Sequence, residues 1–325
     1  MDRRNFLLTA ASAMPVWAVA QTRNEATQER PARLIVPYAA GGGADSIGRL
    51  IASALSTRQS RTYYVENKGG AGGSIGTAEA ARSSGQIDTL LLATTAIVSI
   101  NPEIYQHVNY DVTKDFVAVA GVCDAPLVVI TSANSKAANL ADYVAASRKS
   151  PGEMFFASSG NGTIAHVAVA LLNDRLKAGF THVPYGGEAA AVAAVLAGQQ
   201  PIAYYSTLAT ALPLIRAGRV RALGIPSPVR DERLPEVPTL KEQGLKDVDV
   251  AFWYGLLAPS QSRQEWLRSV QSVVLERLAD ASFAEKVASA GFTPTPMSQE
   301  KFQQRIASDI ATYRPLARSL GLQLG

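Results

Sequence analysis

The fold is decided by the stretch RLIVPYAAGGGADSIGRLIASAL, which spans residues 33–55. It opens on a short apolar run that ends at Pro37, as is typical of a β-strand. Three consecutive glycines, Gly41, Gly42 and Gly43, then predict a tight turn. Beyond them apolar residues recur every three or four positions as far as Leu55, which indicates a helix. The stretch therefore predicts a strand, a glycine-rich loop and a helix in immediate succession.

The same strand–loop–helix order recurs along the chain. A second glycine-rich loop, residues 69–73, follows a strand at 63–67 and precedes another helix. A further set begins near residue 128, where loop 159–162 also lies between a strand and a helix. Strands that alternate with helices indicate an α/β fold. We therefore predict two α/β units of similar size, each a mostly parallel sheet flanked by helices.

Composition narrows the functional classes. The chain has 325 residues, of which 47% are hydrophobic and 18% charged, so it can bury substantial cores. Its formal net charge of +4, without a long basic run, gives no support to nucleic-acid binding. A single cysteine, Cys123, excludes an internal disulfide framework and a cysteine-based zinc site. We find no metal-ligand spacing and expect neither a metal nor a cofactor.

Residues 1–20 have the features of a secretory signal peptide. An arginine pair, Arg3-Arg4, precedes an apolar run, and the small residues Ala18-Val19-Ala20 stand before Gln21. The start is similar to a twin-arginine signal but departs from it at two positions, which leaves the export route open. The run is shorter than the roughly 20 residues of a membrane span. We therefore expect a cleaved leader and a periplasmic protein rather than a membrane-anchored one.

The glycine-rich loops are suited to holding an anion. A helix that begins directly after such a loop offers unpaired N–H groups and a partial positive charge. Together these groups can bind an anion without a charged side chain. Hydroxyl and amide side chains lie in or beside the loops, namely Ser46, Ser74, Ser158, Ser159, Asn161 and Thr163. The sequence thus favours a small anion held between the two units.

Two of the loops also fit motifs of other chemistries. Residues 72–76 fit the G-x-S-x-G nucleophile elbow, in which Ser74 would need a histidine partner. The segment before it looks like a loop rather than the strand that the elbow requires. Residues 160–165 fit a variant dinucleotide fingerprint, but no acidic residue ends a strand about 20 residues later. We keep a secreted serine hydrolase or esterase that uses Ser74 as the alternative.

Segments at residues 33–45, 65–73, 160–166, 182–185 and 253–255, with others between them, carry a family resemblance. In this order they strongly resemble the Bug-type extracytoplasmic solute receptors of tripartite tricarboxylate transporters. The resemblance covers most of the chain beyond the leader.

The resemblance implies a two-lobed periplasmic binding protein of the type II-like class. Residues 31–127 and 252–325 would form lobe 1, and residues 128–251 would form lobe 2. A small organic carboxylate would bind in the cleft, for uptake or for sensing, without a catalytic step. We expect a monomer whose partners are integral-membrane transporter subunits or a sensor kinase.

The resemblance also implies ligand contacts, carried over position by position. In lobe 1 these are Tyr38, Gly41, Gly42, Gly43, Ser74 and Thr95; in lobe 2 they are Ser159, Gly160, Asn161, Gly162, Thr163 and Tyr185. Asp45 is expected to accept hydrogen bonds from N–H groups of its own loop. His166 is expected to be a helix-packing residue rather than a ligand contact.

Two departures from the family pattern affect the expected ligand. Many members have lysine at the position of Gly186 and aspartate at that of Ser206, so this cleft would lack two usual charges. Tyr204 and Tyr205 could add an aromatic wall, although alternation along a strand sends only one of them to the cleft. We include Tyr205 and Ser206 among the site residues. We favour a carboxylate whose remainder is uncharged or aromatic over an amino acid.

Overall fold

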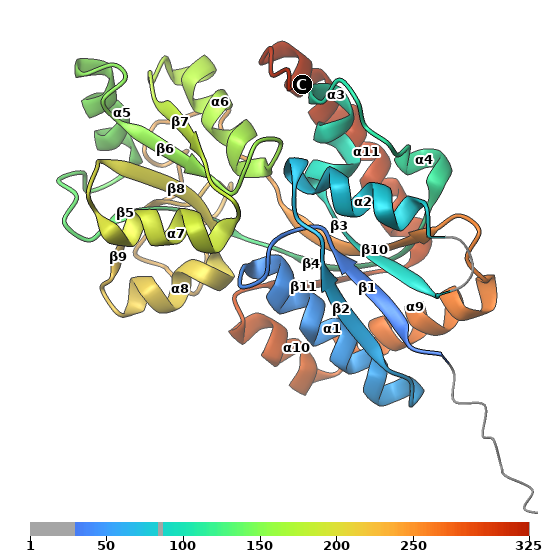
Figure 1. Cartoon of the computed structure of the whole chain (residues 1–325). Coiled ribbons are helices and arrows are strands. Elements are labelled where there is room, and N and C mark those ends of the chain that lie inside the picture. Colours follow the sequence, from blue (N-terminus) through green and yellow to red (C-terminus); the bar gives the residue numbers. More distant parts are fainter. Residues whose placement is uncertain (1–29, 84–86, 325) are drawn as a thin grey trace, which may run out of the picture.

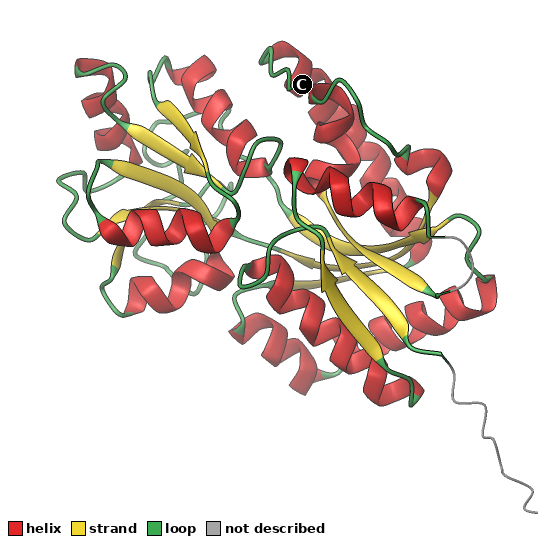
Figure 2. Ribbon diagram, viewed as in Figure 1, coloured by secondary structure: helices red, strands yellow, loops and turns green. Residues whose placement is uncertain are grey.

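The structure is a computed structural model and describes residues 30–83 and 87–324. It contains two sheets that lie side by side, each covered by helices (Figure 1, Figure 2). We call the six-stranded sheet with its helices lobe 1 and the five-stranded sheet with its helices lobe 2. In spatial order, lobe 1 contains β11 (Thr293–Met297), β4 (Phe116–Asp124), β10 (Trp253–Pro259), β3 (Thr89–Thr94), β1 (Ala32–Val36) and β2 (Tyr63–Asn67). Lobe 2 contains β7 (Thr181–Pro184), β6 (Phe155–Ser158), β8 (Ile202–Thr207), β5 (Leu127–Ser132) and β9 (Val220–Gly224).

Helices follow most of the strands. The helices of lobe 1 are α1 (Gly43–Gln59), α2 (Ser74–Ala81), α3 (Asn101–Ile104), α4 (Val112–Asp115), α9 (Gln264–Ala279), α10 (Ala281–Ser289) and α11 (Gln299–Ser319). A 3₁₀ turn at Ala71–Gly73 and a π-helical turn at Ala96–Ile100 lie in the same lobe. Lobe 2 has α5 (Leu140–Lys149), α6 (Ile164–Leu176), α7 (Glu188–Ala197) and α8 (Leu208–Arg216). The strand, glycine loop and helix predicted from residues 33–55 are confirmed as β1, its following turn and α1.

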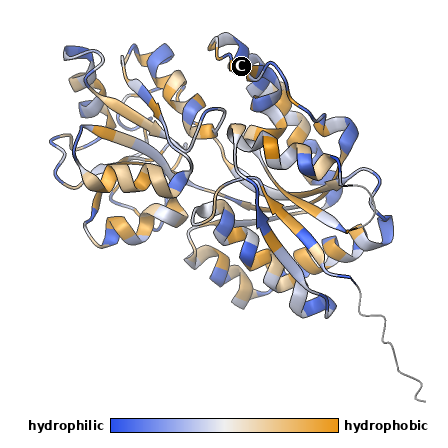
Figure 3. Ribbon diagram, in the orientation of Figure 1, coloured by the Kyte–Doolittle hydropathy of each residue, from blue (hydrophilic) through white to orange (hydrophobic). Residues whose placement is uncertain are grey.

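The central strands of lobe 1 pack helices on both faces. Side chains alternate along β1, so that Leu34 and Val36 join one core cluster and Ile35 joins the other. The first cluster includes residues of α1 and α9, and the second includes residues of α2 and α11. Figure 3 shows the matching hydropathy, with hydrophobic strands beneath helices of mixed character. This double burial explains why β3 is buried along its whole length.

The two-lobed α/β class is confirmed, but both sheets are mixed rather than mostly parallel. β10 runs antiparallel to β3 and β4, and β5 runs antiparallel to β8 and β9. Each of these strands is the first after a crossing between the lobes, so it enters its sheet from the end that faces the other lobe. At the crossing the amide of Ala125 donates to Phe252 O at 2.8 Å, which pairs the two connecting segments.

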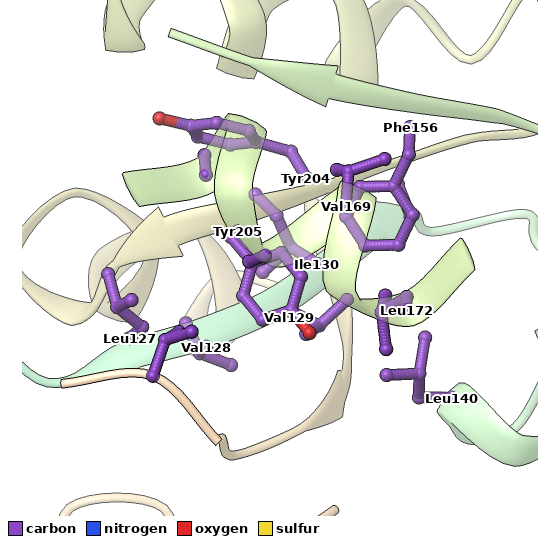
Figure 4. Packing of buried hydrophobic residues seen from close by; sticks show 14 of the residues in the cluster. Leu127, Val128, Val129, Ile130, Leu140, Phe156, Val169, Leu172, Tyr204 and Tyr205 are labelled. Atoms are coloured by element: carbon purple, nitrogen blue, oxygen red, sulfur yellow. The ribbon is translucent and has the colours of Figure 1, made fainter. Parts of the chain in front are cut away.

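Lobe 2 has its own core around β5, β6 and β8 (Figure 4). Phe156 of β6 stacks on Tyr205 of β8, with the ring centroids 5.3 Å apart. Figure 4 shows Tyr204 and Tyr205 on opposite sides of β8, as alternation requires. The described helices include none that is long and apolar enough to cross a membrane. The signal peptide expected at residues 1–20 lies outside the described residues.

Candidate functional site

A cavity of about 570 Å³ opens between the two lobes. Its walls come mainly from loops at the carboxyl ends of parallel strands, where α/β proteins commonly bind ligands. Lobe 1 contributes residues 38, 39, 42, 44, 69–73, 105, 252 and 254, together with Leu324 near the C-terminus. Lobe 2 contributes residues 127, 159–161, 163–165, 184–188, 204, 205 and 207. The loops that the glycine pattern singled out thus face one another across the cavity.

Glycines allow the two lobes to touch at one edge of this cavity. Gly70, Gly72 and Gly73 all have positive φ angles, at 125°, 61° and 99°, which favour glycine. A Cβ atom at Gly72 would lie only 2.8 Å from the carbonyl oxygen of Asn161 in the opposite lobe. The loop after β2 can therefore approach the loop after β6 only because it carries no side chain here.

A tyrosine joins the lobes at the same edge. Tyr105, which follows α3, donates its hydroxyl hydrogen to Asn161 O at 2.8 Å. Burial raises the pKa of this phenol to about 12, so it is a neutral donor at physiological pH. Behind it Asn101 donates to Gly72 O at 2.9 Å and to Ser74 Oγ at 3.1 Å, which fixes the glycine loop. Tyr105 also pairs with Leu324, so the C-terminal segment supports this wall (Figure 1).

A glutamate joins the lobes on another side of the cavity. Glu188 is the first residue of α7 in lobe 2, and its Oε2 accepts the amide hydrogen of Gly43 in lobe 1 at 2.8 Å. Its Oε1 accepts from the amide and the hydroxyl of Thr207, both at 2.8 Å, and from Ser206 Oγ at 3.1 Å. Among the described residues that line the cavity, Glu188 alone has a side chain that is charged at neutral pH.

The first glycine loop is held by its own helix. Asp45 Oδ2 accepts the amide hydrogen of Gly41 at 3.1 Å, which confirms the expected role of Asp45. Burial alone would raise the pKa of this carboxyl group. The hydrogen bonds from Arg49 and Gly41 outweigh it, so the pKa lies below its usual value. The Gly41 amide is consequently occupied within the loop.

The histidines of lobe 2 support the third glycine loop from behind. The Nδ1 atom of His166 accepts the Gly162 amide hydrogen at 3.2 Å, and its ring stacks on His182 with centroids 4.3 Å apart. Burial, and then the neighbouring His182, lower the pKa of His166 to about 4. His166 is buried and is not among the cavity residues, so the expectation that it does not touch the ligand stays a prediction.

The geometry does not assemble the serine nucleophile of the alternative function. Ser74 Oγ accepts from Asn101, and a 3₁₀ turn rather than a strand precedes it. His182 Nε2 lies 2.7 Å from Ser158 Oγ instead, and Ser158 is fully buried. Ser74 therefore has no histidine within hydrogen-bonding distance among the described residues.

Comparison with known proteins identifies the family. The model of the tripartite tricarboxylate transporter family receptor matches residues 47–322, which is most of the chain. The chain belongs to this receptor family. The receptor is 31% identical to the protein BugT of Bordetella pertussis over 320 residues, covering 98% of this chain and 96% of BugT. The Bug-type resemblance seen in the sequence is thereby confirmed.

Solved structures show the same two-lobed fold. The R. palustris protein Rpa4515, solved with adipate, has a TM-score of 0.86 at 26% identity and covers 90% of this chain and 97% of its own. MatC from Rhodopseudomonas palustris, solved with bound malate, has a TM-score of 0.82 at 25% identity and covers 89% and 99%. The receptor therefore shares its architecture with proteins that were solved with small carboxylates.

The structure places the sequence-predicted residues in two groups. Those that line the cavity are Tyr38, Gly42, Ser159, Gly160, Asn161, Thr163, Tyr185 and Tyr205. Those that do not are Gly41, Gly43, Ser74, Thr95, Gly162 and Ser206.

Most of the residues outside the lining have partners within the protein. The amides of Gly41, Gly43 and Gly162 donate to Asp45, Glu188 and His166, in that order. Ser206 Oγ donates to Glu188. Thr95 is fully buried, with its hydroxyl 3.5 Å from Ala251 O. These groups act inside the protein and hold the cavity walls.

Sequence reasoning missed several cavity residues. Tyr105, Glu188, Phe252 and Tyr254 all line the cavity. Tyr204 and Tyr205 are both cavity residues, although their side chains lie on opposite sides of β8 and the Tyr205 ring stacks on Phe156 in the lobe 2 core. The available signal for Glu188 was its position at a helix start directly after two glycines, where an acid is usually attributed to the helix dipole. Tyr105 had no comparable pattern, because its partner is a backbone oxygen in the other lobe.

Proposed function

We propose that this receptor, once exported and freed of residues 1–20, binds a small organic carboxylate between its lobes and presents it to integral-membrane transporter subunits. We keep the lobe bounds expected from the sequence, 31–127 with 252–325 and 128–251, except that Leu127 begins β5 and so belongs to lobe 2. The main support for carboxylate binding is the cavity itself, which lies where glycine loops of both lobes meet. Adipate and malate in the solved relatives support the choice of a carboxylate.

Two helix starts at the cavity wall provide backbone groups that can hold an anion. Helices α2 and α6 begin at its walls, with Gly73 and Thr163 at their N-cap positions. Such helix starts offer free N–H groups and a partial positive charge. No lysine, arginine or histidine is found among the described cavity residues, so in this proposal the helix starts hold the anion. Ser74 accepts from Asn101 and has no histidine partner among the described residues, which is consistent with a receptor rather than a hydrolase.

The test compares acids with neutral amides of the same skeleton. We expect aliphatic and aromatic carboxylates to raise the melting temperature of residues 21–325 and the matching amides to have no effect. At 100 times its dissociation constant, a ligand adds about 2.7 kcal/mol to the free energy of unfolding. This corresponds to a shift of about 5–10 °C for a chain of this size. Amides that stabilise as well as acids would refute the carboxylate proposal.

A variant tests whether the ligand occupies this cavity. A Cβ atom at Gly186 would meet no atom within 4 Å, and no positive φ angle strains the position. Gly186→Phe should therefore fold normally, while its ring at the cavity wall weakens carboxylate binding by at least about tenfold. Gly186→Ala is the matched control and should bind like the wild type. Unchanged affinity in Gly186→Phe would place the ligand elsewhere.

A further inference from the structure

The carboxylate of Glu188 is held as a bound anion would be held. It lies at the start of α1, whose N-cap is Gly42, and at the start of α8, whose N-cap is Thr207. It receives one amide hydrogen from each lobe, from Gly43 and from Thr207, both at 2.8 Å. Two hydroxyl groups, of Ser206 and Thr207, complete its surroundings. A carboxylate belonging to the chain thus fills a position of the kind expected for the ligand.

This carboxylate has little capacity left for other partners. An ionised carboxylate offers about four acceptor positions, and four donors of the protein lie within hydrogen-bonding distance of Glu188. Three of the four belong to its own lobe, so the group stays in place whether or not the lobes separate. Glu188 is therefore better suited to excluding a second anion than to binding a cationic group of the ligand.

No positive charge among the described cavity residues would offset the repulsion between Glu188 and a second anion. Two phenols of the cavity, Tyr204 and Tyr254, have pKa values raised first by burial and then by the negative charge of Glu188. Both are consequently neutral, and the described cavity residues include no cation. Two like charges about 5 Å apart repel each other strongly in a partly buried site. Other aromatic residues, which include Phe252 and Tyr185, also line the cavity.

We propose that Glu188 determines ligand specificity by filling one anion position of the cavity, so that the receptor accepts monocarboxylates with a neutral, apolar or aromatic remainder and rejects dicarboxylates. This inference rests on the proposed carboxylate-binding function and narrows it. Adipate and malate, found with the solved relatives, each carry two carboxylates, so the inference separates this receptor from those proteins in ligand class.

The experiment uses ligands that differ by one charged group. Titration calorimetry measures hexanoate, adipate and 6-aminohexanoate, and benzoate beside terephthalate, on the wild type and three variants. Glu188→Ala empties the anion position, whereas Glu188→Gln fills it with a neutral group of similar size. Glu285→Ala is the control, because Glu285 is exposed on α10 and is not a cavity residue. Thermal unfolding of each variant verifies that it is folded.

We expect the wild type and Glu285→Ala to bind the monoacid of each pair at least about tenfold more tightly than the diacid. In Glu188→Ala the affinity for adipate or terephthalate should rise at least about tenfold, with a smaller rise in Glu188→Gln. If Glu188→Ala does not fold, the inference is tested by whether the affinity for adipate or terephthalate rises in Glu188→Gln.

Three results would overturn the inference while leaving carboxylate binding intact. They are equal wild-type affinity for monoacid and diacid, no gain of diacid binding in the folded variants, and tighter binding of 6-aminohexanoate than of hexanoate. Absence of binding for every acid, in the wild type and in all variants, would instead refute the proposed function and the inference with it.

Discussion

Replacing Tyr105 by phenylalanine removes one oxygen atom from the edge of the cavity and nothing else. The lost atom is the donor of the 2.8 Å hydrogen bond to Asn161 O, which joins lobe 1 to lobe 2. A hydrogen bond between neutral groups contributes about 0.5–1.5 kcal/mol net. If the bond exists only when the lobes are closed on a ligand, Tyr105→Phe should raise the dissociation constant by about 2- to 12-fold. Because Asn161 is exposed, water can replace the donor, and we expect the lower half of this range.

The matched control is Tyr110→Phe, which removes an equivalent oxygen from within one lobe. The Tyr110 hydroxyl donates to Ile97 O, also at 2.8 Å, and both residues belong to lobe 1. Titration calorimetry should show weaker carboxylate binding in Tyr105→Phe, and stopped-flow kinetics should assign the loss to faster dissociation. Tyr110→Phe should lower the free energy of unfolding without changing affinity. Equal affinities in the wild type and Tyr105→Phe would refute the role of this bond in closure.

Three further outcomes are expected. Gly72→Ala should weaken carboxylate binding measured by calorimetry, because its Cβ would lie 2.8 Å from Asn161 O and would force the lobes apart; equal affinity would contradict this. The free energy of unfolding from urea titrations should decrease as the pH falls from about 6.5 to 4, because His166 has a depressed pKa of about 4 and takes up a proton when the chain unfolds. That decrease should be smaller in His166→Gln, and an identical pH profile would argue against it. Ser74→Ala should lose about 0.5–1.5 kcal/mol of stability with its bond to Asn101, yet keep its ligand affinity, since Ser74 is outside the cavity wall.

Local pattern was sufficient to predict the elements that build the cavity. The strand, three glycines and helix of residues 33–55 appear as β1, its turn and α1, because each depends on neighbours in the chain. The internal bond from Gly41 to Asp45 was predictable for the same reason, since donor and acceptor are one helical turn apart. Strand direction was less predictable. β10 and β5 run antiparallel to their neighbours because of where the chain crosses between lobes, which no local pattern records.

The role of the Gly43 amide could not be predicted, because it depends on a side chain distant in the sequence. The resemblance implied that Gly43 contacts the ligand, but its amide donates to Glu188, 145 residues further along the chain. Gly162, by contrast, donates to His166 only one helical turn away, so that contact was open to prediction. The loops were correctly chosen as cavity walls, whereas the assignment of individual N–H groups required the tertiary structure.

The two interlobe hydrogen bonds constrain ligand size unequally. Tyr105 links a lobe 1 side chain to the lobe 2 backbone, and Glu188 links a lobe 2 side chain to the lobe 1 backbone. A ligand too wide for the cavity must break one of them. Breaking a bond between neutral groups costs about 0.5–1.5 kcal/mol, and breaking one to a charged group costs about 1.5–3 kcal/mol. Extra bulk should therefore be tolerated better toward Tyr105 than toward Glu188, so the charged contact limits ligand shape as well as ligand charge.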